Sequence, residues 1–378
     1  MKIVIAPDSF KESLTALEAA TAIENGMKKI LPEASFVKVP MADGGEGTVQ
    51  SLVDATGGKI ITKTVTGPLG TPVEAFFGIS GDEKTAVIEM AASSGLHLVP
   101  PEERNPLVTT TRGTGELIAA ALDYGVEHII IGIGGSATND GGAGMARALG
   151  IMLLDADGKE ILEGGGALNN LSTVNMAGID TRLGAVKIEV ACDVDNPLTG
   201  VRGASHIFGP QKGATQEMVE VLDNNLHHFA EILRTDLGKN IEHVSGAGAA
   251  GGLGGGLMAF LSAELKRGVD IVLDAAKLET HLQDADFVIT GEGKIDGQTI
   301  FGKTPIGVAK TAKIQNVPVI AIAGNVASGC EVVHEHGIDA VFSIVPGVIT
   351  LEDAFENART YVERIAANIA SVIKLSKQ

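Results

Sequence analysis

Acidic and basic side chains gather in three short segments, each of which follows an apolar run of the sequence. These segments are APDSFKES with Asp8, Ser9 and Lys11, MADGGEGT with Asp43 and Glu46, and TGEGKIDG with Glu292, Lys294 and Asp296. Carboxylates coordinate divalent cations or accept protons, and lysine side chains bind phosphate oxygens. Helix capping explains any one segment, because Asp and Ser are common N-cap residues. The three segments together favour a ligand site.

A fourth acidic segment, ACDVDNPLTG, follows another apolar run. It contains Asp193 and Asp195, and carboxylates at positions i and i+2 of an extended segment lie on the same side. Both could bind one magnesium ion, or one could bind the metal while the other accepts a proton. An Asx turn before Pro197 is the structural alternative.

The charge balance makes individual cations informative. With 29 basic and 47 acidic residues, the formal net charge is −18, which opposes binding to nucleic acid or to an anionic membrane surface. An anionic ligand must then be met by local cations, for which Arg104, Arg112 and Lys212 are candidates. The chain has no Trp, and no apolar run approaches the ~20 residues of a membrane span. We therefore predict a cytoplasmic protein without nucleic-acid or membrane partners.

The segment GQTIFGKT, residues 297–304, matches the phosphate-loop pattern G-x-x-x-x-G-K-[ST]. A true phosphate loop begins directly after its strand, whereas the apolar run here ends at Gly291 and EGKID intervenes. Pro305 favours Thr304 as the N-cap of the next helix. We therefore predict that the match is incidental, and that the lysine of TGEGKIDG is required for turnover while the lysine of the motif is not.

A dinucleotide-binding pattern begins at Gly132. An apolar run precedes Gly132-x-Gly134-x-x-Ala137, and Asp155 follows at about the expected 20 residues. Two features oppose this interpretation, because the next helix begins late, after TNDGG, and a DG turn reverses the chain soon after Asp155. An NAD(P)-dependent hydroxy-acid oxidoreductase is therefore kept only as an alternative.

Buried parallel strands are predicted at both ends of the chain, because short Val- and Ile-rich runs alternate there with helical patterns. The predicted strands are Lys2–Pro7, Ser35–Pro40, Asp286–Gly291, Val317–Gly324 and Ala340–Gly347. The predicted helices are Thr15–Ile30, Gly47–Thr56, Pro305–Gln315, Glu331–Glu335 and Leu351–Leu375. Between the chain ends, residues 58–98 alternate polar and apolar side chains as antiparallel strands do.

These elements predict the domain organisation. The 378 residues are enough for about two domains. We predict an α/β protein in which residues 1–60 and 285–378 form a flavodoxin-like, doubly wound parallel sheet, with a mixed α/β domain inserted at residues 61–284. Ligands of such sheets bind outside the carboxyl ends of the strands, where the three polar segments converge. We expect the active site in a cleft between the two domains.

The polar segments belong to a longer series of motifs. These are APDSFKESLTA, PMADGGEGT, GPLG, IEMAASSGL, RNPLVTTTRGTGELI, GIGGSATNDGGAGMARALG, CDVDNPL, FGPQKGA, GAGAAGGLG and TGEGKIDGQTIFGKTP. The series resembles the bacterial glycerate kinases of the two-domain type that lacks a phosphate loop, from Met1 to the last predicted helix. The resemblance implies phosphorylation of D-glycerate by ATP with Mg²⁺, commonly to 2-phosphoglycerate and otherwise to 3-phosphoglycerate. A homo-oligomer is compatible with it.

With the resemblance in hand, we predict in-line phosphoryl transfer and a role for each candidate residue. The catalytic residues are Asp193 as general base, with Lys11 and Lys294 at the phosphates. Substrate binding is assigned to Asp8, Ser9, Asp43, Arg104, Arg112, Asn139 and Lys212. Cofactor binding is assigned to Gly44, Gly45, Glu46, Gly134, Gly135, Ser136, Gly291 and Glu292, and metal binding to Asp195 and Asp296. A sugar-acid-binding protein without catalysis is a second alternative.

Overall fold

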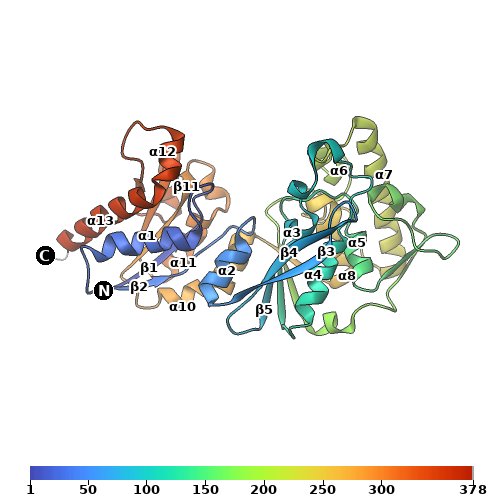
Figure 1. Cartoon of the computed structure of the whole chain (residues 1–378), viewed down its shortest axis with the longest axis horizontal. Helices are drawn as coiled ribbons and strands as arrows, with labels where there is room; N and C mark the ends of the chain where they lie inside the picture. The colour runs from blue at the N-terminus through green and yellow to red at the C-terminus, as the bar shows by residue number, and fades with distance from the viewer. Residues whose placement is uncertain (377–378) are drawn as a thin grey trace. The chain divides into compact units, whose positions relative to one another are not determined.

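The computed structural model describes residues 1–376 and divides into two compact units (Figure 1). The first unit contains Met1–Asp43, Gln50–Gly57 and the chain from Val269 onward, and the second contains Gly44–Val49 and Gly58–Gly268. Both are α/β structures, and the first is built from both ends of the sequence. Within residues 1–376, no helix is both long enough and apolar enough to cross a bilayer.

A five-stranded parallel sheet forms the centre of the first unit. Its strands are β1 (Lys2–Pro7), β2 (Ser35–Lys38), β11 (Phe287–Ile295), β12 (Val319–Val326) and β13 (Ala340–Ser343), in the order β13-β12-β11-β1-β2. Every neighbouring pair is parallel. The inner strands are rich in Val and Ile, which suit a sheet that is covered on both faces.

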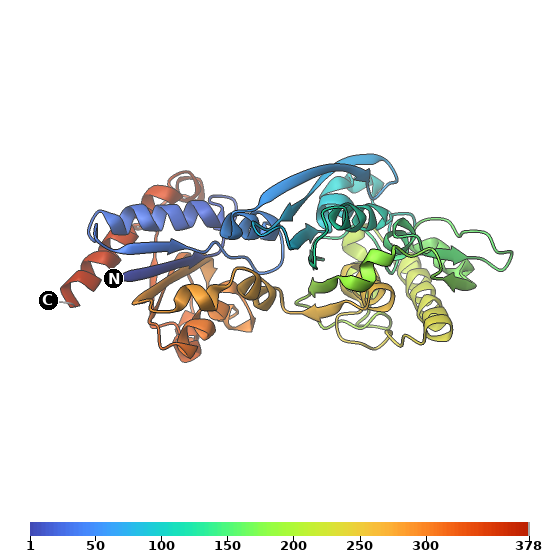
Figure 2. The ribbon, with the colours of Figure 1, turned by 90° about the horizontal axis from the view of Figure 1, so that it is seen from below.

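Helices cover both faces of this sheet. The helices that belong wholly or mostly to the first unit are α1 (Ala16–Lys28), α2 (Thr48–Thr56), α9 (Gly268–Ala275), α10 (Leu278–Leu282), α11 (Thr304–Ile314), α12 (Leu351–Glu356) and α13 (Ala358–Ser376). Helices α1 and α13 share a core with Ile3 and Ile5 of β1, whereas α11 packs against β1, β11 and β12. Figure 2 shows α1 in blue on one side of the strands and the orange helices on the other.

Helix α1 begins with a capping box and lies close to α13. Thr15 Oγ1 accepts the amide of Glu18, and the Glu18 carboxylate accepts the amide of Thr15. Gly26 allows the close approach, since a Cβ at this position would lie 2.2 Å from Glu363 O. The two helices therefore pack closely against each other over the sheet.

The second unit contains a mixed six-stranded sheet in the order β10-β9-β6-β5-β4-β3. Its strands are β3 (Lys59–Thr66), β4 (Pro72–Ile79), β5 (Thr85–Glu89), β6 (His128–Gly132), β9 (Lys187–Ala191) and β10 (Glu264–Lys266). Strands β3, β4 and β5 are antiparallel, as the sequence predicted, and β5, β6, β9 and β10 are parallel. A separate antiparallel pair joins β7 (Met152–Leu154) to β8 (Thr173–Asn175).

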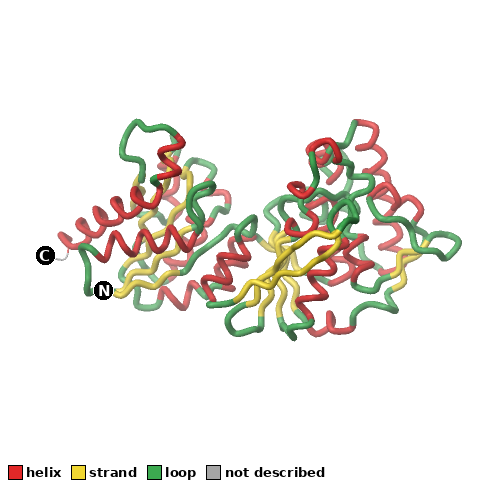
Figure 3. Tube along the Cα trace, viewed as in Figure 1, coloured by secondary structure: helices red, strands yellow, loops and turns green. Residues whose placement is uncertain are grey.

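The helices of the second unit share one core with its sheet. They are α3 (Ala91–Ser94), α4 (Arg112–Leu122), α5 (Ala143–Ala148), α6 (Ala204–Phe208), α7 (Gln216–Leu237) and α8 (Leu253–Leu261). Phe77 of β4, Leu117 of α4 and Phe229 of α7 are fully buried in this core. Figure 3 shows the strands of each unit in yellow, gathered as a layer with red helices around them.

Strand β11 corrects the prediction that it ends at Gly291. It continues to Ile295, because Glu292 and Lys294 still pair with β12. Gly291 is a strand residue in close contact with its neighbour, since a Cβ there would lie 2.2 Å from Ile322 O. Glu292 and Lys294 therefore project from the strand itself and not from a loop, whereas Asp296 follows the end of the strand.

The last two predicted helices also differ from the structure. Residues 331–335 belong to a 3₁₀ turn, η8 (Cys330–His336), which is flanked by Gly329 and Gly337, both with positive φ. The predicted helix 351–375 is interrupted at Asn357, whose side chain donates to Asp353. Side-chain hydrogen bonds of this kind compete with continuation of a helix.

Candidate active site

A pocket of about 780 Å³ lies in the first unit, at the carboxyl ends of β1, β11, β12 and β13. Its charged lining residues include Asp8, Lys11, Asp43, Glu292, Lys294 and Lys303. Its apolar lining residues include Val345, Val348, Ile349, Leu351 and Phe355. The pocket therefore offers an ionic surface and an apolar surface to one ligand.

Strand pairing explains why residues from opposite ends of the chain meet in this pocket. Pro7 of β1 pairs with Gly291 of β11, so Asp8 and Glu292 follow side by side. The amide of Asp8 donates to Gly291 O at 2.8 Å. Parallel strands bring their carboxyl ends to one edge of the sheet, and the polar residues at those ends converge there.

Asp8 is a carboxylate with two short hydrogen bonds. Thr304 Oγ1 donates to Asp8 Oδ2 at 2.5 Å, and the amide of Ser9 donates to Oδ1 at 2.6 Å. Loss of water nevertheless raises the pKa of Asp8 to about 6, and the nearby charge of Asp43 adds to the rise. A cation that approaches Asp8 would therefore stabilise the ionised form of its carboxylate.

Glu292 lies in a similar environment. Burial raises the pKa of Glu292 to about 7, although Lys303 Nζ, 3.4 Å from Oε2, favours the charged form. The charge of Asp8 adds to the rise, and Thr299 Oγ1 donates to Glu292 Oε1 at 3.3 Å. Asp8 and Glu292 are thus two neighbouring carboxylates whose charged forms a nearby cation would stabilise.

The lysine and threonine of GQTIFGKT reach these two carboxylates, which corrects the interpretation of that segment. The N-cap of α11 is Lys303 and not Thr304, and Pro305 is the second helical residue. The Thr304 hydroxyl donates to Asp8 instead of capping the helix. Lys303 lines the same pocket as Lys294, so the structure gives no reason to treat one of the two lysines as dispensable.

The loop before α11 is nevertheless not an open phosphate cradle. A cradle needs free main-chain amides that point at the ligand. Here the amides of Gln298 and Thr299 donate to Asp296, and those of Phe301 and Lys303 donate to other residues of the loop. Strand β11 extends up to this loop, so the position of the strand does not distinguish the loop from a phosphate loop. The distinction is that the main-chain amides of the loop are already used in hydrogen bonds.

The donor chemistry of the pocket fits magnesium. Within residues 1–376, no three His, Cys, Asp or Glu side chains come together as a ready-made metal site. Magnesium is usually held by one or two carboxylates, with water and substrate phosphates as the other ligands. Asp8 and Glu292 supply two such carboxylates that lack a full complement of positive charge. Asp296, a predicted metal ligand, is instead paired with Lys294 at 2.8 Å.

Asp193 and Asp195 follow β9 in the second unit. The amide of Gly268 donates to Asp193 Oδ1 at 3.1 Å. The exposed carboxylate of Asp195 forms an ion pair with Arg202 at 2.9 Å. The two carboxylates therefore have different partners, and that of Asp195 is already neutralised by a cation.

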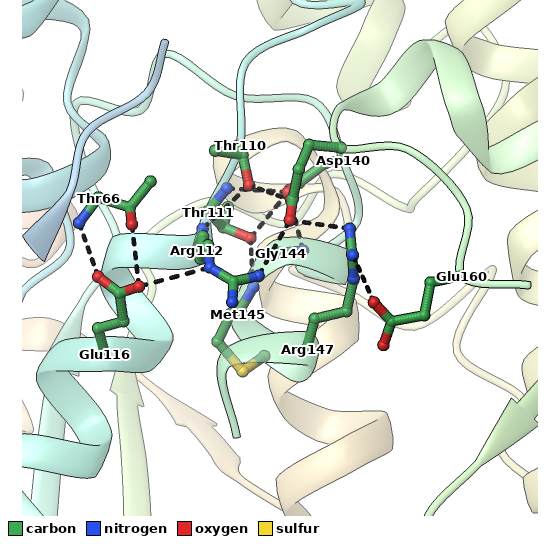
Figure 4. A network of polar contacts seen from close by, with 11 residues as sticks. Thr66, Thr110, Thr111, Arg112, Glu116, Asp140, Gly144, Met145, Arg147 and Glu160 are labelled. Atoms are coloured by element: carbon green, nitrogen blue, oxygen red, sulfur yellow. Dashed lines mark hydrogen bonds and ion pairs between the residues drawn. The ribbon is translucent and has the colours of Figure 1, made fainter. Parts of the chain in front are cut away.

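Arg112 belongs to the charged network of Figure 4. Its guanidinium lies 3.4 Å from Glu116 Oε1 and 3.1 Å from Glu163 Oε1. Glu116 also accepts the amide of Thr66, and Glu163 also accepts Arg147. The predicted carboxylate-binding guanidinium thus already forms one ion pair within α4 and one with the segment that contains Glu163.

Asp140 anchors the loop after β6 and lies in the same view (Figure 4). Its fully buried carboxylate accepts the amide and the hydroxyl of Thr111 and the amides of Gly142 and Gly144. Burial raises the pKa of Asp140, and these donors oppose the rise. The acid holds the loop against the start of α4 and fixes the start of α5.

Lys212, a predicted anion contact, is buried. It is 1% exposed, and its ammonium group donates to Thr138 O at 2.7 Å. Loss of water lowers the pKa of Lys212 to about 7. Asn139, also buried, donates to Ser205 Oγ. Within the part of the chain that the structure describes, the buried Nε of Arg104 has no hydrogen-bond partner.

The glycine-rich loop Gly134–Ser136 does not belong to a dinucleotide-binding unit. Such a unit runs from strand through a short loop to a helix and then to a parallel strand. Here α5 begins only at Ala143, and β7 belongs to the separate antiparallel pair. The chain reverses through a turn at Asp155–Lys159. This topology contradicts the oxidoreductase interpretation.

The predicted site residues thus fall into two groups. Those in the pocket of the first unit are Asp8, Ser9, Lys11, Asp43, Glu292 and Lys294, with Gly291 buried beneath them in β11 and Asp296 paired to Lys294. Those in the second unit are Gly44, Gly45, Glu46, Arg104, Arg112, Gly134, Gly135, Ser136, Asn139, Asp193, Asp195 and Lys212.

Sequence reasoning missed the apolar wall of the pocket. Val348 is fully exposed and Leu351 is 69% exposed. Both lie close to the start of α12, where Thr350 caps the helix. Apolar residues in a turn-rich segment before a capped helix were the available signal, but the same pattern also occurs in ordinary loops.

Comparison with known proteins gives consistent matches over the whole chain. The model of the "Glycerate kinase family" matches residues 3–374. A relative from Bacillus subtilis (strain 168), named glycerate kinase, is 65% identical over 377 residues, which are 100% of this chain and 99% of the relative. A relative from Escherichia coli (strain K12), named glycerate 2-kinase, is 58% identical and covers 99% of this chain and 98% of its own. A crystal structure of a glycerate kinase 2 from Salmonella typhimurium LT2 matches with a TM-score of 0.93 and 58% identity, over 100% of this chain and 99% of that one.

Proposed function

Because the chain belongs to the glycerate kinase family, we propose that this kinase transfers the γ-phosphoryl group of ATP to D-glycerate, with 2-phosphoglycerate as the product. The choice of the 2-hydroxyl rests on the relative from Escherichia coli, which is named glycerate 2-kinase. The two earlier alternatives are set aside, since relatives at 65% and 58% identity are named as kinases.

The pocket of the first unit is the observation that carries the proposal. Its volume of about 780 Å³ is within the usual range for small-molecule sites. Lys11, Lys294 and Lys303 supply positive charge for phosphates in a chain of net charge −18. Val345 and Phe355 supply an apolar surface for the base. We place the nucleotide here, with its phosphates at the strand ends.

A flavodoxin-like arrangement of the first unit supports this placement. Along the chain, the five parallel strands take the order 2-1-3-4-5, which is that of flavodoxin-like sheets. Ligands of these sheets bind where the connections on either side leave in opposite directions, between the first and third strands. Asp8 and Glu292 follow those two strands. We propose that the second unit is the inserted domain.

We assign the magnesium ion to Asp8 and Glu292, with the Thr304 hydroxyl as a further oxygen donor. When bound, the ion would neutralise charge on the phosphates. We prefer these residues to Asp195 and Asp296, because both of the latter are already paired with cations. The three lysines orient the phosphates and stabilise the charge that develops during transfer.

Asp193 remains our choice of general base for the glycerate hydroxyl. It accepts the main-chain amide of Gly268, and its neighbour Asp195 is paired with Arg202. Arg104 is the preferred contact for the glycerate carboxylate, because Arg112 already forms two ion pairs. Asp193→Asn is expected to lower kcat about 10²-fold. Near-native turnover of this variant would remove Asp193 from that role.

A coupled assay of ADP release with D-glycerate, ATP and magnesium tests the proposal directly. We expect turnover that depends on all three components. Phosphorus NMR of the product then identifies the hydroxyl, since the phosphorus of 2-phosphoglycerate couples to one carbon-bound proton and that of 3-phosphoglycerate to two. Absence of ADP release with D-glycerate would refute the proposal, and a product coupled to two protons would refute the choice of hydroxyl.

A further inference from the structure

Glu89 is a buried acid of the second unit that the proposed mechanism does not use. It is the last residue of β5 and is 8% exposed. Its Oε1 accepts the amide of Val49 at 2.9 Å, and the amides of Gly47 and Thr48 also donate to its carboxylate. The charge of Glu46 has the same sign and also raises the pKa of Glu89. Three main-chain amides therefore stabilise this buried charge.

These three amides form the N-terminus of α2. The first amides of a helix have no partner within the helix and carry partial positive charge. After a glycine-rich loop such as Gly44–Gly47, a helix end of this kind is a common phosphate site. Here a carboxylate of the chain occupies the position that a phosphate would take. The nucleotide phosphates must then be bound by other groups.

A second anchor lies at the other end of this segment. Gly44 has a φ of 91°, and a Cβ there would lie 2.6 Å from Gly268 Cα and 2.8 Å from Ala191 Cβ. Close packing thus fixes Gly44, and Glu89 fixes Val49. Asp43 is bonded directly to Gly44, lines the pocket of the first unit, and contributes to the raised pKa of Asp8.

We propose that Glu89 is a positioning residue: its carboxylate acts as a built-in anion at the N-terminus of α2 and holds in place the segment that begins after Asp43. The inference rests on the proposed function, because it assigns Asp43 to the phosphoryl-transfer pocket. Removal of the Glu89 carboxylate leaves a vacant anion site lined by three amides. A small carboxylate from solution can then take its place.

The test is chemical rescue of Glu89→Ala by formate. In the assay with ATP and D-glycerate, we expect kcat to fall about 10-fold while the KM for D-glycerate changes less than about twofold. Added formate should restore most of the loss, whereas equal chloride should not. Formate should also raise the unfolding temperature of Glu89→Ala but not of the wild type. The matched control is Glu127→Ala, because Glu127 is an exposed acid of the same unit paired with Lys84; neither the change nor formate should alter its turnover.

Each outcome of these experiments on Glu89 either supports or overturns the inference. A folded Glu89→Ala protein with native kcat, or one whose lower kcat does not respond to formate, overturns the inference. If Glu89→Ala does not fold, Glu89→Gln decides, since it keeps the shape but not the charge. We expect a lowered kcat without rescue, because the glutamine still fills the site, and native kcat would overturn the inference. Absence of turnover in the wild type would instead refute the proposed function, while the effect of formate on unfolding still tests the anion site.

Discussion

Glu292 in the first unit and Glu189 in the second are both largely buried glutamates on parallel strands, yet their charges have opposite surroundings. Glu189 lies 2.7 Å from Lys187 Nζ and 2.5 Å from Lys266 Nζ. Burial alone would raise the pKa of Glu189, but these cations lower it to about 2. Glu292 has Lys303 and a second carboxylate as neighbours, and its pKa rises to about 7.

The comparison shows that two nearby lysines reverse the effect of burial on the pKa of Glu189, whereas Lys303 does not reverse it at Glu292. The side chain of Glu189 is 7% exposed and that of Glu292 is 14% exposed, so both lose most of their water. A buried carboxylate whose cations are supplied by the chain contributes to the fold. The ionised form of a buried carboxylate with too few nearby cations is unfavourable until a ligand brings positive charge. We therefore expect substitution of each to affect a different property.

The largest expected effect is loss of turnover in Glu292→Gln. The amide keeps the shape but cannot neutralise a bound cation, so kcat should fall about 10²-fold or more. The unfolding temperature should stay the same or rise, because an uncompensated charge has been removed. Steady-state kinetics and thermal unfolding on one preparation measure both. Native kcat together with a lower unfolding temperature would place Glu292 in the same structural class as Glu189.

An intermediate effect is expected for Lys303→Ala, which removes the cation beside Glu292. We expect kcat/KM for ATP to fall about 10-fold, with Lys294→Ala similar, because both ammonium groups line the pocket. Lys84→Ala is the matched control, since Lys84 is exposed and paired with Glu127 in the second unit. If only Lys294→Ala loses activity, the original interpretation of GQTIFGKT as incidental stands.

The smallest effect on function is expected for Glu189→Gln. Its kcat should remain within about twofold of native, while the unfolding temperature drops by roughly 5–10 °C because two lysines lose their partner. The folded pKa of Glu189, about 2, lies below its ordinary value of 4.5, so its charge stabilises the fold fully above that value. This contribution is lost as the pH falls from about 4.5 towards 2.

A pH series of unfolding measurements checks the sign. The difference in unfolding temperature between wild type and Glu189→Gln should be constant near neutral pH and should shrink below about pH 4.5. A difference that grows with acidity would mean that the lysines do not hold the charge of Glu189. The comparison with Glu292 would then rest on kinetics alone.

The pattern of the sequence was sufficient to locate the strands and the polar residues at their ends. The run KIVIAP is β1 from Lys2 to Pro7, as predicted, because Val- and Ile-rich runs closed by Pro and Asp have few alternative structures. The end of β11 was predicted four residues too early, since Gly291 looks like a turn residue in isolation. Pairing with β12 keeps that segment extended, and this pairing cannot be predicted from the local sequence.

The burial and the distant partners of polar side chains could not be predicted from the sequence. Lys212 lies in FGPQKG, a segment that is typical of an exposed turn, yet it is 1% exposed and donates to Thr138 O. Thr304 looked like a helix cap, yet its hydroxyl donates to Asp8, which is distant in the sequence. Both outcomes depend on segments that the local pattern does not describe.

By itself, therefore, the sequence determined which residues could do chemistry and on which elements they lie, because strand and turn preferences act over a few neighbouring residues. Only the tertiary structure decided that β1 lies beside β11, so that Asp8 meets Glu292. Only the tertiary structure decided that one buried glutamate is paired with lysines while the other is left short of positive charge. The physical reason is that strand order, desolvation and Coulomb interactions depend on distances in space, and residues far apart in the chain set those distances.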